Sequence, residues 1–230
     1  MAEEHAPAAE ARAAARVDAL VDAAFAFAVT LLLIAGAPPA SLDELVGSLG
    51  RLPAFLASVA LILSFWLGHR NYSRCAARRA PGATTLSLAL VFMVLVYVFP
   101  LRLVTESAMH FLSGGRLPGR ELLDSFDDLR VLYAVYGLGF SVMAVILALL
   151  LRGERAAGPA LVQAAREWTW TYVLVAASGV LSVVVALWGP IVAAPWLPGA
   201  VYMLIPAGLP LLLRRLRLRA PAPAPESSAP

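Results

Sequence analysis

The 230-residue chain has no lysine, one cysteine, three histidines and few charged residues of any kind. Because Cys75 is the only thiol, an intramolecular disulfide and any metal site built from several cysteines are excluded. The histidines are too few and too scattered to predict a metal site, so we expect neither a metal nor a cofactor. Charged residues make up only 14% of the chain, against about 25% in soluble domains. This shortage of charge nearly excludes a water-soluble globule, and we expect no nucleic-acid partner.

Hydrophobic residues make up 60% of the chain and gather in six continuous blocks. A block of about 20 apolar residues can cross the hydrocarbon core as a helix. Helices are favoured over strands because the blocks do not alternate between apolar and polar residues. The sequence therefore predicts an all-α, polytopic membrane protein with six transmembrane helices per chain. The predicted helices are Val17–Gly36, Pro53–Asn71, Thr84–Val104, Leu129–Leu151, Trp168–Trp188 and Ala193–Leu213.

The segments outside these blocks are short. We expect a cytoplasmic N-terminal segment at 1–16, the transmembrane domain at 17–214 and a disordered, Ala/Pro-rich tail at 215–230. Between the first two blocks, Ser41 and Glu44 have the spacing of a capping box. This pattern predicts a short amphipathic helix that lies at the membrane interface.

All 18 basic residues are arginines, and their distribution predicts the orientation of the chain. Arginine is enriched in the cytoplasmic connections of membrane proteins. We therefore expect a multi-pass protein of the cell membrane with both termini in the cytoplasm. Thirteen arginines lie on the predicted cytoplasmic side: Arg12, Arg16, Arg70, Arg74, Arg78, Arg79, Arg152, Arg155, Arg166, Arg214, Arg215, Arg217 and Arg219. The other five are Arg51, Arg102, Arg116, Arg120 and Arg130.

Polar residues gather at the cytoplasmic ends of the first two predicted helices. Helix 1 carries Arg16 and Asp22, and helix 2 carries Trp66 and His69 one turn apart. An ionised residue inside an apolar segment usually faces the bundle or a watery cavity and has a partner. One interpretation is therefore a polar cluster of these four residues. The alternative is that Asp22 snorkels or caps its helix while Trp66 and His69 are ordinary interfacial residues.

Above Asp22, helix 1 carries bulky apolar residues at helical spacing. Phe27, Leu31 and Ile34 share one face, with Thr30 at its edge. Ordinary helix packing would produce the same stripe. Rings of apolar side chains can also gate a pore by excluding water, so both interpretations stay open on the spacing alone.

The same residues carry a resemblance to a known family. Arg16-x-x-x-Leu20-Val21-Asp22, followed by the segment 26–32 (AFAVTLL), resembles helix 1 of the transmembrane protein 175 potassium channels. The Trp66-x-x-His69 ending of helix 2 resembles that family too. Six helices and cytoplasmic termini match its prokaryotic branch, of which this chain looks like a divergent member.

This resemblance implies a potassium-permeable cation channel rather than an enzyme. It implies a homotetramer in the lipid bilayer, with helix 1 lining a central pore and no carbonyl-type selectivity filter. By resemblance, the pore-lining residues are Phe27, Thr30, Leu31 and Ile34. The residues that hold the pore helices are Arg16, Asp22, Trp66 and His69.

The chain departs from the family pattern at three positions. Leu20 and Val21 replace the family's Phe-Ser pair, and Phe27 stands where Ile or Leu is usual at the constriction. Two other functions stay open: a small secondary transporter and a non-conducting membrane scaffold. Against a transporter, the sequence has no inverted repeat with matching broken helices. The missing Phe-Ser pair keeps the scaffold open.

Overall fold

The computed structural model describes residues 5–34, 40–76, 79–118, 125–153 and 158–218, with side chains from residue 9 onward. Throughout these ranges the regular structure is helical, and six helices are long and apolar enough to cross a membrane. This confirms the predicted fold class. The first five are α1 (His5–Ile34), α3 (Leu52–Cys75), α4 (Ala83–Leu112), α5 (Phe126–Arg152) and α6 (Pro159–Trp188). The sixth, Leu197–Leu218, joins α7 (Leu197–Ala200), η1 (Val201–Met203) and α8 (Leu204–Leu218).

The helices extend beyond the apolar blocks that predicted them. Residues 5–16, expected as a separate segment, continue α1 because this stretch is rich in alanine, the strongest helix former. The start of α6 lies nine residues before the predicted one, since Pro159 suits a first helical position. The end of α8 is Leu218, inside the predicted tail. The remainder of that tail, 219–230, lies outside the described residues.

The predicted short helix between the first two spans is α2 (Leu42–Leu49). The Ser41 hydroxyl accepts a hydrogen bond from the Glu44 N–H at 3.2 Å. The Glu44 carboxylate in turn accepts from the Ala40 N–H at 2.7 Å. The side chains of α2 are mostly exposed, as expected for a helix at an interface.

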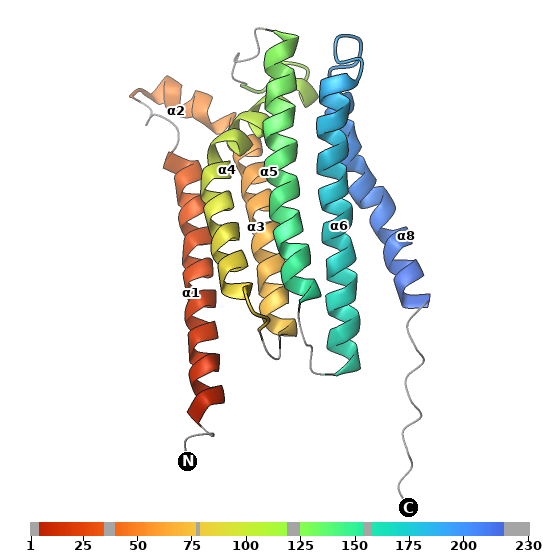
Figure 1. Cartoon of the computed structure of the whole chain (residues 1–230). Coiled ribbons are helices and arrows are strands. Elements are labelled where there is room, and N and C mark those ends of the chain that lie inside the picture. Colours follow the sequence, from red (N-terminus) through yellow and green to blue (C-terminus); the bar gives the residue numbers. More distant parts are fainter. Residues whose placement is uncertain (1–4, 35–39, 77–78, 119–124, 154–157, 219–230) are drawn as a thin grey trace, which may run out of the picture.

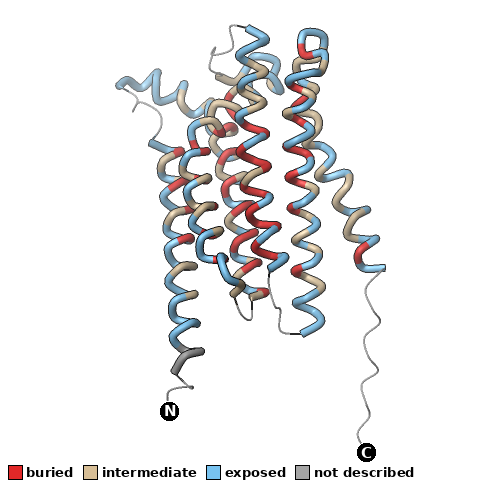
Figure 2. Tube along the Cα trace, in the orientation of Figure 1, coloured by how far each residue is buried: buried red, intermediate tan, exposed pale blue. Residues whose placement is uncertain are grey.

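Helix α5 lies at the centre of the bundle, and α1 and α8 lie at its two edges (Figure 1). Helix α1 begins at the end of the bundle where α8 finishes. Buried residues are concentrated on α5 (Figure 2), where they make up 67% of the most apolar window, against 22% in α1 and 6% in the last span. The core is therefore built around α5, and α1 offers a large open surface.

Helices α5 and α6 pack with their backbones close together. Gly137 and Gly179 lie against each other, so a Cβ on either would press on the carbonyl oxygen of the other. Ser141 strengthens this crossing, because its hydroxyl is placed to donate to the Ala176 carbonyl, 3.1 Å away on α6. Small residues that permit such close approach are common between membrane helices. The crossing makes α5 and α6 the most extensive helix pair in the bundle.

Candidate pore-lining site

Helix α1 has one buried face and one open face. The buried residues, with at most 2% of their surface exposed, are Val21, Phe25, Ala28 and Leu32. On the opposite side Phe27 is 55% exposed, Ile34 is 63% exposed, and Thr30 is exposed as well. The Thr30 hydroxyl donates to the Ala26 carbonyl of its own helix at 3.1 Å. The open face is thus an apolar stripe with one hydroxyl, and no described segment of the same chain covers it.

Three of the four predicted pore residues lie on this open face, but Leu31 does not. Leu31 is half-buried and packs against the core of its own chain. The reason is helical geometry: each residue turns by about 100°, so Leu31 sits at the border between the faces while Phe27, Thr30 and Ile34 cluster opposite the core.

The two residues that replace the family's Phe-Ser pair have opposite environments. Val21 is completely buried and belongs to the apolar core, whereas Leu20 is 52% exposed. A valine needs no hydrogen-bond partner, so this position is satisfied by apolar packing alone. The departure from the family pattern at Val21 is therefore accommodated inside the chain.

Asp22 on α1 is joined to Trp66 on α3. The indole N–H of Trp66 donates to Asp22 Oδ1 at 2.8 Å. The guanidinium of Arg70 lies over the same indole ring, 5.3 Å from its centroid. Of the four residues expected to form one polar cluster, the structure brings these two into direct contact.

His69 and Arg16 are placed elsewhere. His69 is buried, and its Nε2 lies 3.0 Å from the Ser87 hydroxyl on α4, so this side chain links α3 to α4 rather than to Asp22. Arg16 is exposed, and no ion pair or hydrogen bond of its side chain is found within the described ranges. The alternation of buried and exposed positions on α1 points Arg16 along the open face.

A second link between α1 and its neighbours was missed by the sequence analysis. Asp18 Oδ1 accepts hydrogen bonds from the Ser73 hydroxyl at 2.9 Å and from Arg79 Nη2 at 2.5 Å. Arg79 also lies over the ring of Tyr72, 5.7 Å from its centroid. Asp18 stands one turn before Asp22, so the two acids follow one line along the helix. That i, i+4 spacing was the only available signal in the sequence.

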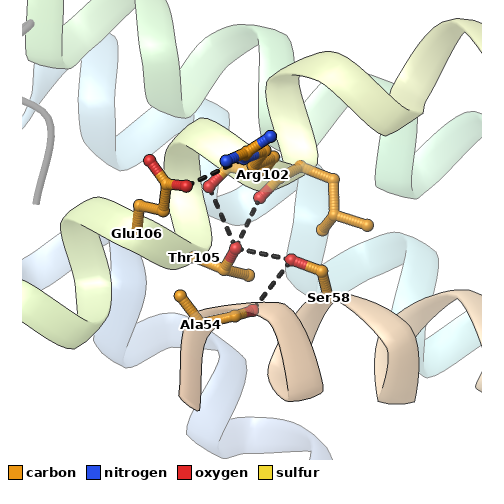
Figure 3. Close-up of polar contacts among 6 residues, drawn as sticks. Ala54, Ser58, Arg102, Thr105 and Glu106 are labelled. Carbon is orange, nitrogen blue, oxygen red and sulfur yellow. Dashed lines mark hydrogen bonds and ion pairs between the residues drawn. The ribbon is translucent and has the colours of Figure 1, made fainter. Parts of the chain in front are cut away.

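A third polar group joins α3 and α4 near their other ends (Figure 3). The Ser58 and Thr105 hydroxyls lie 2.6 Å apart, and Thr105 also bonds the Leu101 and Arg102 carbonyls of its own helix. Arg102 Nε donates to Glu106 at 2.8 Å, and only 4% of the Glu106 side chain is exposed. These contacts follow Pro100, which interrupts the hydrogen bonding of α4 because it lacks an N–H. The group supports the shape of α4 where the helix is weakest.

The interior of the bundle holds little free space. A cavity between α3, α4 and α5 has a volume of about 10 Å³ and is lined by residues such as Ile62, Phe65 and Phe140. A single water molecule needs about 10–15 Å³ of such space. Within the described ranges, no group of three or more His, Cys, Asp or Glu side chains could hold a metal ion.

Comparisons with known proteins find similar sequences and structures. Residues 16–100 match the profile of the endosomal/lysosomal potassium channel TMEM175 family. A protein of Marivirga tractuosa named "Potassium channel" is 28% identical over 142 residues, which are 59% of this chain and 57% of that protein. The chain thus matches little more than half the length of this curated relative.

Two solved structures share the fold. A variant of the potassium channel MtTMEM175, crystallised with a nanobody fusion protein, has a TM-score of 0.74 and 23% identity, covering 89% of this chain and 94% of that one. A lysosomal potassium-selective channel TMEM175 homolog from Chamaesiphon Minutus has a TM-score of 0.58 and 22% identity, covering 92% and 100%. Residues 16–100 thus resemble the TMEM175 channels in sequence, and the chain shares the fold of two TMEM175 structures, which confirms the resemblance predicted from its first two helices.

Proposed function

We propose that the protein is a potassium-permeable cation channel whose pore is formed between four copies of the chain, with α1 of each copy facing the pore. The observation that carries this proposal is the open face of α1. A helix whose one side is fully buried exposes Phe27, Thr30 and Ile34 on the other. Related proteins named or described as potassium channels support potassium as the permeant ion.

The tight interior of a single chain favours a path between copies. The cavity of about 10 Å³ within the bundle is lined largely by apolar side chains and is too small to hold a row of water molecules. A hydrated cation needs such a row. Helix α1 lies at the edge of the bundle (Figure 1), so four chains can bring this helix to a common axis.

Phe27 forms the constriction in this arrangement. Four phenyl groups at one level exclude water and raise the barrier to a hydrated cation. Ile34 adds a second apolar ring about two turns farther along, and Thr30 places a hydroxyl oxygen between them. Leu31 stands at the border of this face and packs against the core of its own chain. No carbonyl-type filter is needed, because side chains rather than backbone oxygens set the barrier.

The polar contacts of α1 hold the pore helix against the rest of its chain. Asp22 is tied to Trp66, and Asp18 is tied to Arg79 and Ser73. His69 stabilises the neighbouring helix pair, because it joins α3 to α4 through Ser87. Arg16 lies on the open face near the shared entrance, where the four copies bring four positive charges together. The protein acts in the cell membrane with both termini in the cytoplasm.

The proposal is tested by potassium flux into liposomes that contain the purified protein. Phe27→Ala should widen and wet the constriction, so potassium flux should rise severalfold and discrimination against sodium should fall. Leu138→Ala is the matched control: Leu138 is 62% exposed on α5, a helix of the bundle centre that does not pack against α1. Phe140, a phenylalanine on the same helix, is unsuitable as a control because it is buried, and its truncation would cost about 3–5 kcal/mol of stability.

Equal effects of Phe27→Ala and Leu138→Ala on flux would remove α1 from the conduction path. The mass of the assembly, measured by native mass spectrometry, is the second check. A monomer would contradict the shared pore, and a stable tetramer without potassium flux would favour the non-conducting scaffold.

A further inference from the structure

A groove between α5 and α6 lies outside the pore proposed above. Its volume is about 630 Å³, and it opens to the surface of the bundle. The two helices that form its walls are the pair with the close glycine crossing. The groove lies toward the ends of α5 and α6 that carry Arg152 and Arg166, the same end at which α1 begins.

The lining of the groove changes from apolar to positively charged along its length. Its lining includes apolar side chains such as Val145, Ala148, Leu149 and Val173, and toward the end of α5 and the start of α6 it includes Arg152 and Arg166. Both arginines are exposed, and neither takes part in an ion pair found within the described ranges. The neighbouring acid Glu167 binds Arg217 on α8 instead. Two positive charges are thus left at the mouth of an apolar groove.

The start of α6 adds to the positive potential at this mouth. Val162, in the first turn of α6, lines the groove. The cap residue of that helix is Gly158, which provides no side-chain hydrogen bond to the first-turn N–H groups. Free N–H groups at a helix start attract anions, so they act in the same direction as the two arginines.

We propose that this groove binds an anionic phospholipid, with an acyl chain on the apolar wall and the phosphate headgroup on Arg152 and Arg166. Charge complementarity selects this occupant. A zwitterionic lipid brings an ammonium group beside its phosphate and so adds no net negative charge to the two arginines, and a free phosphate would leave the apolar wall exposed. Trp170, which is 46% exposed at the groove, has the amphipathic ring typical of the level of lipid headgroups. The site lies away from α1 and does not depend on ion conduction.

Native mass spectrometry of the delipidated full chain, titrated with phosphatidylglycerol or phosphatidylcholine, tests the site. The wild type should retain phosphatidylglycerol selectively. The double variant R152Q/R166Q should raise the apparent dissociation constant for phosphatidylglycerol by roughly tenfold or more. The matched control is R214Q/R215Q, which removes two exposed arginines from α8 at the same end of the bundle. Equal weakening in both double variants would show general charge attraction and overturn the proposal.

Two further arms separate other occupants from the lipid. Val145→Trp should fill the apolar wall while leaving both arginines in place, and it should weaken phosphatidylglycerol binding without changing the mass of the assembly. If it breaks the assembly instead, the groove is a contact between copies and the proposal fails. Glycerol phosphate, which has the headgroup charge without acyl chains, should not displace the lipid at equal concentration. Displacement would identify a free-phosphate site and overturn the proposal that the groove binds a lipid.

Discussion

At the scale of single residues, the contact between Asp22 and Trp66 is the part of the α1 attachment that can be measured most directly. A hydrogen bond to a charged group contributes about 1.5–3 kcal/mol. In a double-mutant cycle of Asp22→Ala and Trp66→Phe, we expect a coupling free energy of roughly 1–2 kcal/mol. The measurement is reversible unfolding in mixed micelles.

The matched control is a second cycle of Asp22→Ala with His69→Ala. Because His69 bonds Ser87 and does not contact Asp22, this cycle should show a coupling near zero. A larger coupling for His69 than for Trp66 would contradict the placement of these side chains. The two cycles thus separate the observed contacts from the single four-residue cluster suggested by the sequence.

Residue spacing could predict part of this site but not all of it. The seven-residue separation of Phe27 and Ile34 places them on one face, and both are exposed. It could not predict which side of α1 the core occupies, and this is why Leu31 was assigned to the pore face although it packs inward. The contact of Asp18 with Arg79 spans 61 positions along the chain, and no local pattern reports a contact of that kind.

At the scale of elements, glycine-to-alanine substitutions should have opposite effects on stability at the crossing of α5 and α6 and in α2. A Cβ at Gly179 would collide with Ser141 and with the Gly137 carbonyl, so Gly179→Ala should destabilise the fold by about 1–3 kcal/mol. Gly47 on α2 has open space around its Cα, so Gly47→Ala should stabilise α2 by up to about 1 kcal/mol. Thermal unfolding in detergent measures both changes. A loss of stability at Gly47 comparable to that at Gly179 would contradict this account of the crossing.

The existence of the six long helices was predictable because each apolar block is continuous and long enough to cross a membrane. Their ends were not predictable from hydropathy, because helices continue into polar segments wherever the residues favour helix. Residues 5–16 of α1 and the first turns of α6 show this. Capping chemistry was a better guide: the spacing of Ser41 and Glu44 predicted α2, which the structure contains.

At the scale of the whole molecule, the arrangement of the helices in the bundle could not be predicted from the sequence. Mean hydropathy ranks only the extremes: it is highest for α5, the most buried span, and lowest for the last span, the least buried. Among the other four spans burial does not follow mean hydropathy, because it depends on which helices meet and on small residues such as Gly137 and Gly179. The exposed sides of α1 and of the last span therefore face lipid or other copies of the chain.

The orientation of the whole chain is the last prediction, and it rests on the thirteen-to-five distribution of arginines. Cys75 is buried, so it is replaced by alanine and a single cysteine is introduced at an exposed site. Arg116 follows α4 at one end of the bundle, and Arg215 lies near the end of α8 at the other. A membrane-impermeant maleimide should label Arg116→Cys in intact cells but Arg215→Cys only after permeabilisation. Each variant removes one arginine, so the charge bias is preserved in both. Labelling of Arg215→Cys in intact cells would place the termini outside and reverse the topology.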